Sequence, residues 1–159
     1  MRFLTSVTIL GIFVLLNAGS ALAQQMPNPY GANINLAAAK KVAAAAAAKA
    51  SEMKLNMVIA IADTGGQLVY LERNDVVQWG SVDVAIHKAK ASVQYKRATV
   101  ALENAVKANV NYLTLDGISA IEGGVPIVED GKIIGAIGVS GGSSVQDGQV
   151  ASAAVTMIK

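Results

Sequence analysis

Residues 123–147, GGVPIVEDGKIIGAIGVSGGSSVQD, decide the fold class of this chain. An apolar run from Val125 to Val128 is followed by Glu-Asp-Gly-Lys, and the Asp-Gly pair favours a two-residue hairpin turn. Residues from Ile133 to Val139 then predict the returning strand. Within that strand, Gly135 and Gly138 mark positions where another backbone or a ligand lies close. The stretch therefore predicts an antiparallel β-hairpin with a close contact on its second strand.

The end of the same stretch predicts the start of a closing helix. Ser144 to Asp147 has the Ser-x-x-Asp form of a capping box, and the helix is expected to run nearly to the end of the chain. Backbone N–H groups near Gly142, Ser143 and Ser144 are free at such a start and can receive a carboxylate. A cap without any ligand fits the same residues, and the charge of Asp147 would repel an anion on the first turn.

The remaining chain predicts a second hairpin set among helices. Met57 to Ala62 is an apolar run, Asp63 to Gly66 is a turn, and Gln67 to Glu72 predicts the returning strand. Helices are predicted where alanine or an apolar face recurs, over residues 36–53, 81–95 and 99–110. The expected caps of these helices are Asn33 or Asn35, Ser81 and Thr99. Hairpins separated by helices indicate an antiparallel sheet with helices packed on it, so the predicted fold class is α/β, more closely α+β.

The first 23 residues have the anatomy of a secretory signal peptide. Arg2 supplies a positive charge, residues 4–16 are largely apolar, and Ala21-Leu22-Ala23 forms a small-x-small cleavage site. The alternative is an uncleaved N-terminal anchor. We predict cleavage after Ala23, a periplasmic or extracellular location, a flexible segment over 24–33, and a single domain over 34–159.

Charge and composition exclude several classes of function. Removing Arg2 from the 13 basic residues leaves 12 against 11 acidic ones, and a net charge of +1 gives no electrostatic case for nucleic acid or for a membrane surface. With no cysteine, the chain has no disulfide, thiolate zinc site or catalytic thiol. A single histidine, without an H-E-x-x-H, P-loop or dinucleotide signature, favours a binding protein over an enzyme. Small side chains make a core of modest volume, so a homo-oligomer is expected.

Both hairpins and two helices resemble the GlcG/HbpS-like haem-binding family, which includes the C-terminal domain of PduO proteins. The resemblance rests on GGVPIVEDGKIIGAIGVSGGSSVQD, VIAIADTGGQLVYLER, SVDVAIHKAKAS and the Ala-rich first helix, and it covers about residues 35–159. It implies a profilin-like fold, in which a central antiparallel sheet of two hairpins is flanked by helices. It also implies haem as the cofactor, with haem degradation or redox sensing in some members, glycolate or diol utilisation operons in others, and homo-oligomers in several.

Haem binding needs an iron ligand, and His87 is the only imidazole in the chain. It lies four residues after Asp83, which can orient it on a helix. The alternative is a solvent-facing or interface histidine, because His87 shares a helix face with Asp83, Lys90 and Gln94, opposite the apolar stripe. The other candidate iron ligands are tyrosines: Tyr70, Tyr95 and Tyr112.

The rest of the predicted site lies around the second hairpin and the start of the closing helix. The residues expected to hold the ligand there are Glu122, Gly123, Gly124, Pro126, Gly141, Gly142, Ser143 and Ser144. The Gly123-Gly124 pair would let a planar ligand contact the backbone, although an ordinary turn would use the same residues. Four basic residues around the second helix would pair with haem propionates or else form a solvated face: Lys88, Lys90, Lys96 and Arg97.

These residues and the resemblance predict an exported haem-binding protein, with haem storage, sensing or degradation as its role. Two alternatives remain open. One is an enzyme or accessory factor that acts on a small 2-hydroxy acid or related metabolite in the same glycine-lined pocket. The other is a ligand-free oligomeric assembly module whose hairpins build a subunit interface.

Overall fold

Both predicted hairpins form, and they make one antiparallel sheet in the computed structural model, which describes residues 27–157. The strands are β1 (Val58–Asp63), β2 (Leu68–Arg73), β3 (Gly124–Glu129) and β4 (Lys132–Ser140). Their order across the sheet is β2-β1-β4-β3, so the two hairpins join through β1 and β4. Asp130 and Gly131 have φ angles of 48° and 72°, which confirms the predicted Asp-Gly turn. The predicted signal peptide, residues 1–23, lies outside the described residues.

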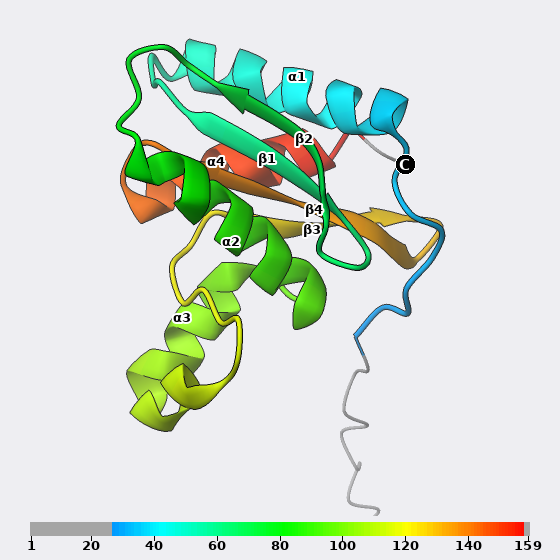
Figure 1. Cartoon of the computed structure of the whole chain (residues 1–159), viewed down its shortest axis with the longest axis vertical. Coiled ribbons are helices and arrows are strands. Elements are labelled where there is room, and N and C mark those ends of the chain that lie inside the picture. Colours follow the sequence, from blue (N-terminus) through cyan, green and yellow to red (C-terminus); the bar gives the residue numbers. More distant parts are fainter. Residues whose placement is uncertain (1–26, 158–159) are drawn as a thin grey trace, which may run out of the picture.

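Helices cover both faces of this sheet (Figure 1). One face carries α1 (Leu36–Glu52) and α4 (Ser144–Val155), and the other carries α2 (Gly80–Gln94). The chain then forms α3 (Thr99–Ala108) and the short 3-10 helix η1 (Val110–Thr114), which make a lobe beside α2. The predicted helices over 36–53, 81–95 and 99–110 are confirmed and differ only at their ends. No helix among residues 27–157 is both long and apolar enough to cross a membrane.

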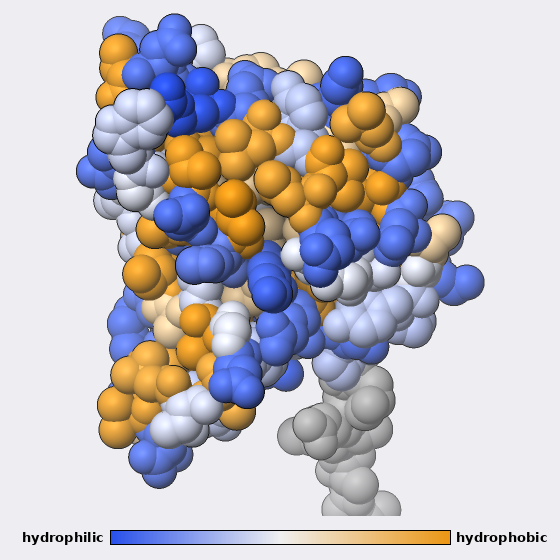
Figure 2. Space-filling model, viewed as in Figure 1, coloured by the Kyte–Doolittle hydropathy of each residue, from blue (hydrophilic) through white to orange (hydrophobic). Residues whose placement is uncertain are grey.

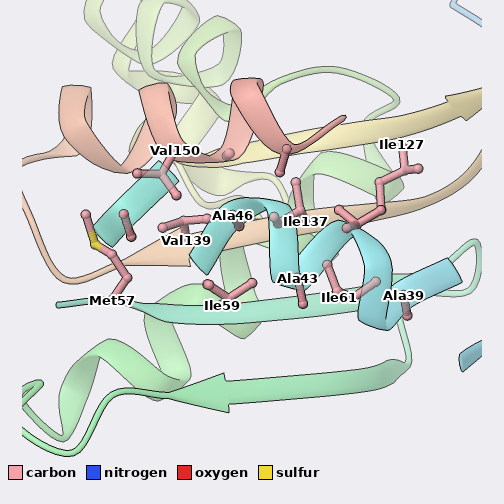
Figure 3. Packing of buried hydrophobic residues seen from close by; sticks show 14 of the residues in the cluster. Ala39, Ala43, Ala46, Met57, Ile59, Ile61, Ile127, Ile137, Val139 and Val150 are labelled. Carbon is pink, nitrogen blue, oxygen red and sulfur yellow. The ribbon is translucent and has the colours of Figure 1, made fainter. Parts of the chain in front are cut away.

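Side chains of the two central strands alternate between the two faces of the sheet, as the period of a strand requires. The larger core lies under α1 and α4 (Figure 3), and it includes Ile59, Ile61, Ile137, Val139, Ala43, Ala46 and Val150. On the opposite face, Val58 and Ala60 pack against α2. The buried face of α1 is made largely of alanine, so the helix lies close to the sheet and to α4. Asn35 caps α1, because its side chain accepts a hydrogen bond from the N–H of Ala38 at 2.9 Å.

Helix α2 crosses the sheet over two paired glycines, Gly138 of β4 and Gly124 of β3. A Cβ on Gly138 would lie 2.0 Å from the carbonyl oxygen of Ala85, and one on Gly124 would lie 2.3 Å from that of Lys88. The close contact predicted for Gly138 is therefore confirmed, and the backbone that approaches is the chain's own α2. This contact fixes where α2, and every side chain on it, stands relative to the sheet.

The buried face of α2 differs from the predicted stripe of Val82, Ile86, Ala89 and Val93. Val82 and Ile86 are only half-buried, whereas Ser81 and Ser92 are fully buried. Ala85 and Ala89, the α2 residues whose backbone lies against Gly138, are small and likewise fully buried. The predicted cap at Ser81 is wrong, since the helix already includes Gly80 and Ser81 instead accepts a hydrogen bond from Gln78.

The segment before α1 runs along the free part of β4. The N–H of Ile133 donates to the carbonyl of Pro29, and the N–H of Gly31 donates to the carbonyl of Ile133, both at 2.8 Å. The N–H of Ile34 donates to the carbonyl of Ile134 at 2.7 Å. The hydroxyl of Tyr30 also donates to the carbonyl of Val93 at 2.8 Å. From Pro29 onward, the segment predicted to be flexible is thus paired with the sheet, beyond the end of β1.

Candidate functional site

The start of α4 was expected to offer the N–H groups of Gly142, Ser143 and Ser144 to an anion, and side chains of α4 accept from two of them, Gly142 and Ser143. Ser143 is the N-cap: its hydroxyl accepts from Gln146 N–H at 3.3 Å, and the Gln146 side chain accepts from Ser143 N–H at 2.9 Å. The capping box therefore begins one residue before the predicted Ser144–Asp147 box, which is wrong. The side chain of Asp147 is therefore not part of the capping box. Its Oδ1 instead accepts a hydrogen bond from Gly142 N–H at 2.9 Å.

Asp147 also forms a buried ion pair with Lys88 of α2. Lys88 Nζ lies 2.7 Å from Asp147 Oδ2 and donates to the carbonyl oxygen of Val139 at 3.0 Å. Only 1% of Lys88 and 2% of Asp147 is exposed, so the interpretation of Lys88 as part of a solvated or propionate-binding cluster is wrong. Burial raises the pKa of Asp147, while Lys88 and the Gly142 N–H oppose that rise. The pair ties α2 to α4 across the end of the sheet.

Glycine at position 123 makes room for this ion pair. Gly123 has a φ of 129°, and a Cβ there would lie 2.8 Å from Lys88 Nζ and 2.9 Å from the Cβ of Asp147. Its neighbour Gly124 donates its N–H to the buried hydroxyl of Thr99 at 2.8 Å. That bond also corrects the prediction for Thr99, which does not cap α3, because the N-cap is Ala98. Both glycines are buried among the chain's own groups.

The other predicted residues around this hairpin also contact the chain itself. Glu122 donates its N–H to Glu103 Oε2 at 2.9 Å, and its carboxylate packs where a side chain at Gly148 would lie. Pro126 is half-buried within β3. Gly141 is exposed with a φ of 154°, and the backbone of Asn56 and Met57 lies against it. The structure thus brings Gly123 and Gly142 to the ion pair and leaves Gly141, Ser143 and Ser144 at the surface or partly covered.

His87 lies on the exposed outer face of α2, with Asp83, Lys90 and Gln94, as its spacing predicts. The hydroxyl groups of two candidate tyrosines already form hydrogen bonds within the chain. Tyr95 donates to the carbonyl of Asp116 at 2.6 Å, and Tyr70 donates to Glu72 Oε2 at 3.1 Å. The third, Tyr112, is 44% exposed on η1. His87 and Tyr112 are therefore the candidate iron ligands that an external group reaches without displacing an internal hydrogen bond.

Two surface pockets lie elsewhere in the described part of the chain. One has a volume of about 310 Å³ and lies where α1 ends beside β1 and β2. The other has a volume of about 250 Å³ and is lined by Asn109, Asn111, Tyr112 and Leu115 of the η1 lobe. None of the residues predicted for the glycine-lined site lines either pocket. Sequence reasoning missed the first pocket because its walls come from a helix end, a loop and a strand, with no motif.

Fold and site together define an α+β domain built on two hairpins, in which residues 27–157 present no cluster of three or more side chains suited to a metal ion. The chain belongs to the family described as "Haem degrading protein HbpS-like", which it matches over residues 34–156. The resemblance found in the sequence is confirmed.

Individual proteins support the same assignment. The chain is 36% identical over 129 residues to an uncharacterised 15.0 kDa protein from the dhaT-dhaS intergenic region of Citrobacter freundii, covering 78% of this chain and 91% of that protein. It is also 36% identical over 103 residues to Protein GlcG of Escherichia coli K12, covering 64% and 77%. The crystal structure of the PduOC:heme complex superposes with a TM-score of 0.72 at 26% identity, covering 80% of this chain and 96% of that one.

Proposed function

We propose that this chain is an exported haem-binding protein that stores, senses or helps to degrade haem. The observation that carries the proposal is its similarity to the haem complex of PduOC, at 26% identity over 80% of this chain. Membership of the HbpS-like family over residues 34–156 supports the same ligand. The single exposed histidine supplies an imidazole of the kind that binds haem iron.

We assign iron ligation to His87, on the outer face of α2. Asp83 stands one helical turn before it and can orient the imidazole, as carboxylates do for metal-bound histidines. Lys90 lies three residues after His87 on the same exposed face, so it can meet a propionate. The α4 start is a poorer propionate site, because Asp147 and Gln146 already accept from the N–H groups of Gly142 and Ser143.

The other wall of the haem pocket comes from a second copy of the chain under this proposal. The exposed face of α2 around His87 is polar and covers little of an apolar macrocycle. Beside it, the lobe of α3 and η1 exposes the apolar residues Val110, Leu113 and Leu115, visible as an orange patch at the lower left of Figure 2. A homo-oligomer would cover such a patch, which otherwise contacts water.

A hemin titration of the mature chain tests the proposal. We expect a Soret shift with saturable binding, and His87→Ala should change the Soret position and weaken binding at least about tenfold, because the axial ligand is lost. Tyr112→Phe removes the other accessible ligand while keeping the ring, and it should leave the spectrum unchanged. Absence of any shift would overturn haem binding, and a spectrum that responds to Tyr112→Phe but not to His87→Ala would overturn the ligand assignment.

Export is tested separately. Expressed with its full sequence in a bacterium, the protein should be recovered from the periplasm or medium with its N-terminus at Gln24, because the Ala-Leu-Ala site directs cleavage after Ala23. Intact-mass measurement of each fraction reads the cleavage. Full-length protein retained with the membrane fraction would instead support the uncleaved anchor.

A further inference from the structure

We propose that the pocket at the end of α1, called here the α1–β2 pocket, binds a small aliphatic molecule through its ammonium group. The pocket is lined by residues from the last turns of α1, the loop into β1, the start of β1 and the end of β2. Its volume of about 310 Å³ is at the lower end for ligand sites and too small for a haem macrocycle. The proposal is therefore independent of haem binding at His87.

Apolar residues form part of the wall of the α1–β2 pocket, whose accessible surface is otherwise mostly polar. Ala47 and Ala50 of α1 end at their Cβ atoms, so they do not fill the space beside Met57 and Ile59. Leu55 adds a further apolar side chain from the loop. A short alkyl chain would contact this apolar part of the wall, and each methylene group that it buries contributes about 0.8 kcal/mol.

The carbonyl groups of Ala50 and Ser51, two of the α1 residues that line the pocket, already accept hydrogen bonds within the chain. Lys54 adopts the left-handed conformation, with a φ of 56°, and its N–H donates to the carbonyl of Ser51 at 3.0 Å. The N–H of Leu55 donates to the carbonyl of Ala50 at 2.9 Å, which completes a Schellman motif. Recognition of a polar group in the pocket therefore falls to side chains.

Glu72 is the side chain suited to a cation. Glu72 lines the pocket, is exposed, and takes part in none of the three ion pairs found among residues 27–157. The hydroxyl of Tyr70 donates to Glu72 Oε2 at 3.1 Å, which holds the carboxylate in place and raises the pKa of Tyr70. Asn56 and Asn74 add amide groups at the rim, and Lys54 lines the pocket as its one cationic residue. An ammonium group would pair with the Glu72 carboxylate, in competition with the Lys54 side chain that lines the same pocket.

Amide chemical shifts of the apoprotein, followed during titration with n-butylammonium chloride, test this proposal. We expect saturable shifts at Ala50, Asn56 and Asn74 with millimolar affinity, and at least about fivefold weaker binding of n-butanol and of butyrate at the same ionic strength. Glu72→Gln should lower n-butylammonium affinity at least about fivefold, to the level of n-butanol. The matched control Glu129→Gln, an exposed carboxylate at the opposite edge of the sheet, should change it less than twofold.

A second variant separates the pocket from its charge. Ala47→Leu should fill the apolar part of the pocket and abolish the shifts, while the thermal midpoint confirms that the protein is folded. Butyrate binding as tightly as n-butylammonium, or full affinity in Glu72→Gln, would overturn the proposal. Shifts spread over the surface without saturation would do the same. None of these results depends on hemin, so failure here and failure of haem binding are distinguishable.

Discussion

Lys88→Met is expected to lower the free energy of unfolding at pH 7 by about 4 kcal/mol. The change removes the positive partner of Asp147 and leaves a carboxylate buried without its ion pair, a loss worth about 3–5 kcal/mol in other proteins. The carbonyl of Val139 loses its donor at the same time. In the folded variant, Asp147 can avoid being a buried unpaired charge by binding a proton. For a carboxyl group with an ordinary pKa near 3.9, protonation at pH 7 costs about 4 kcal/mol, which limits how much stability is lost. Urea unfolding of the mature chain measures the difference.

The loss of unfolding free energy in Lys88→Met, called here the deficit, should depend on pH, and this dependence identifies its cause. Burial already raises the pKa of Asp147, and removal of Lys88 takes away the largest opposing influence, so the pKa rises further. A carboxyl group whose pKa is higher in the folded than in the unfolded state loses stability as pH rises from the unfolded value through the folded value. The deficit of Lys88→Met relative to the natural chain should therefore be smallest at a pH below the already raised pKa of Asp147 in the natural chain. It should grow by about 1.4 kcal/mol per pH unit between that pKa and the still higher folded pKa of the variant.

Two comparisons make the result specific. Lys90→Met removes an exposed lysine from the same helix and should change stability by no more than about 0.5 kcal/mol at any pH. Adding Asp147→Leu to Lys88→Met should restore most of the lost stability, since a buried pair replaced by apolar groups is often neutral. A deficit that is flat between pH 4 and 7 would show that lost packing of the lysine stem, and not the unpaired charge, is responsible.

This ion pair also shows where sequence reasoning stops. Lys88 and Asp147 are 59 residues apart, and each has an ordinary local explanation, as a helix-surface lysine and as a capping aspartate. Their pairing depends on the angle at which α2 crosses the sheet and on the absence of a side chain at Gly123. Neither the crossing angle of α2 nor the contact with Gly123 can be derived from the residues adjacent to Lys88 or Asp147 in the sequence. Periodicity does place His87 on the exposed face of α2, because exposure there follows from one helix alone.

The hairpins were predictable for a different reason. The Asp130-Gly131 turn and the alternation of β4 are local, and they fix strand pairing within the hairpin. The joining of β1 to β4 follows from no single motif, although Gly138 signals that something lies close to β4. From the sequence alone, either a ligand or another stretch of backbone accounts equally well for a glycine at position 138. Only the position of α2 decides between them.

Gly138→Ala is expected to lower the free energy of unfolding by about 3 kcal/mol, at the upper end for an overpacked core. The new Cβ would lie 2.0 Å from the carbonyl oxygen of Ala85 and 2.6 Å from the nitrogen of Ala89, both of them backbone atoms of α2. Backbone cannot rotate away as a side chain does, so the whole helix has to move off the sheet. The thermal midpoint should fall by about 10 °C in calorimetry.

Gly80→Ala is the matched control for that substitution. Gly80 stands in the first turn of the same helix, and a Cβ there would meet no atom within 4 Å. Alanine favours helix more than glycine and reduces the freedom of the unfolded chain, so this variant should gain up to about 1 kcal/mol. Displacement of α2 also moves His87 and Lys88 with it, so Gly138→Ala should weaken hemin binding where Gly80→Ala does not. Equal midpoints for the two variants would mean that α2 can shift without cost, and that the paired glycines do not set its distance from the sheet.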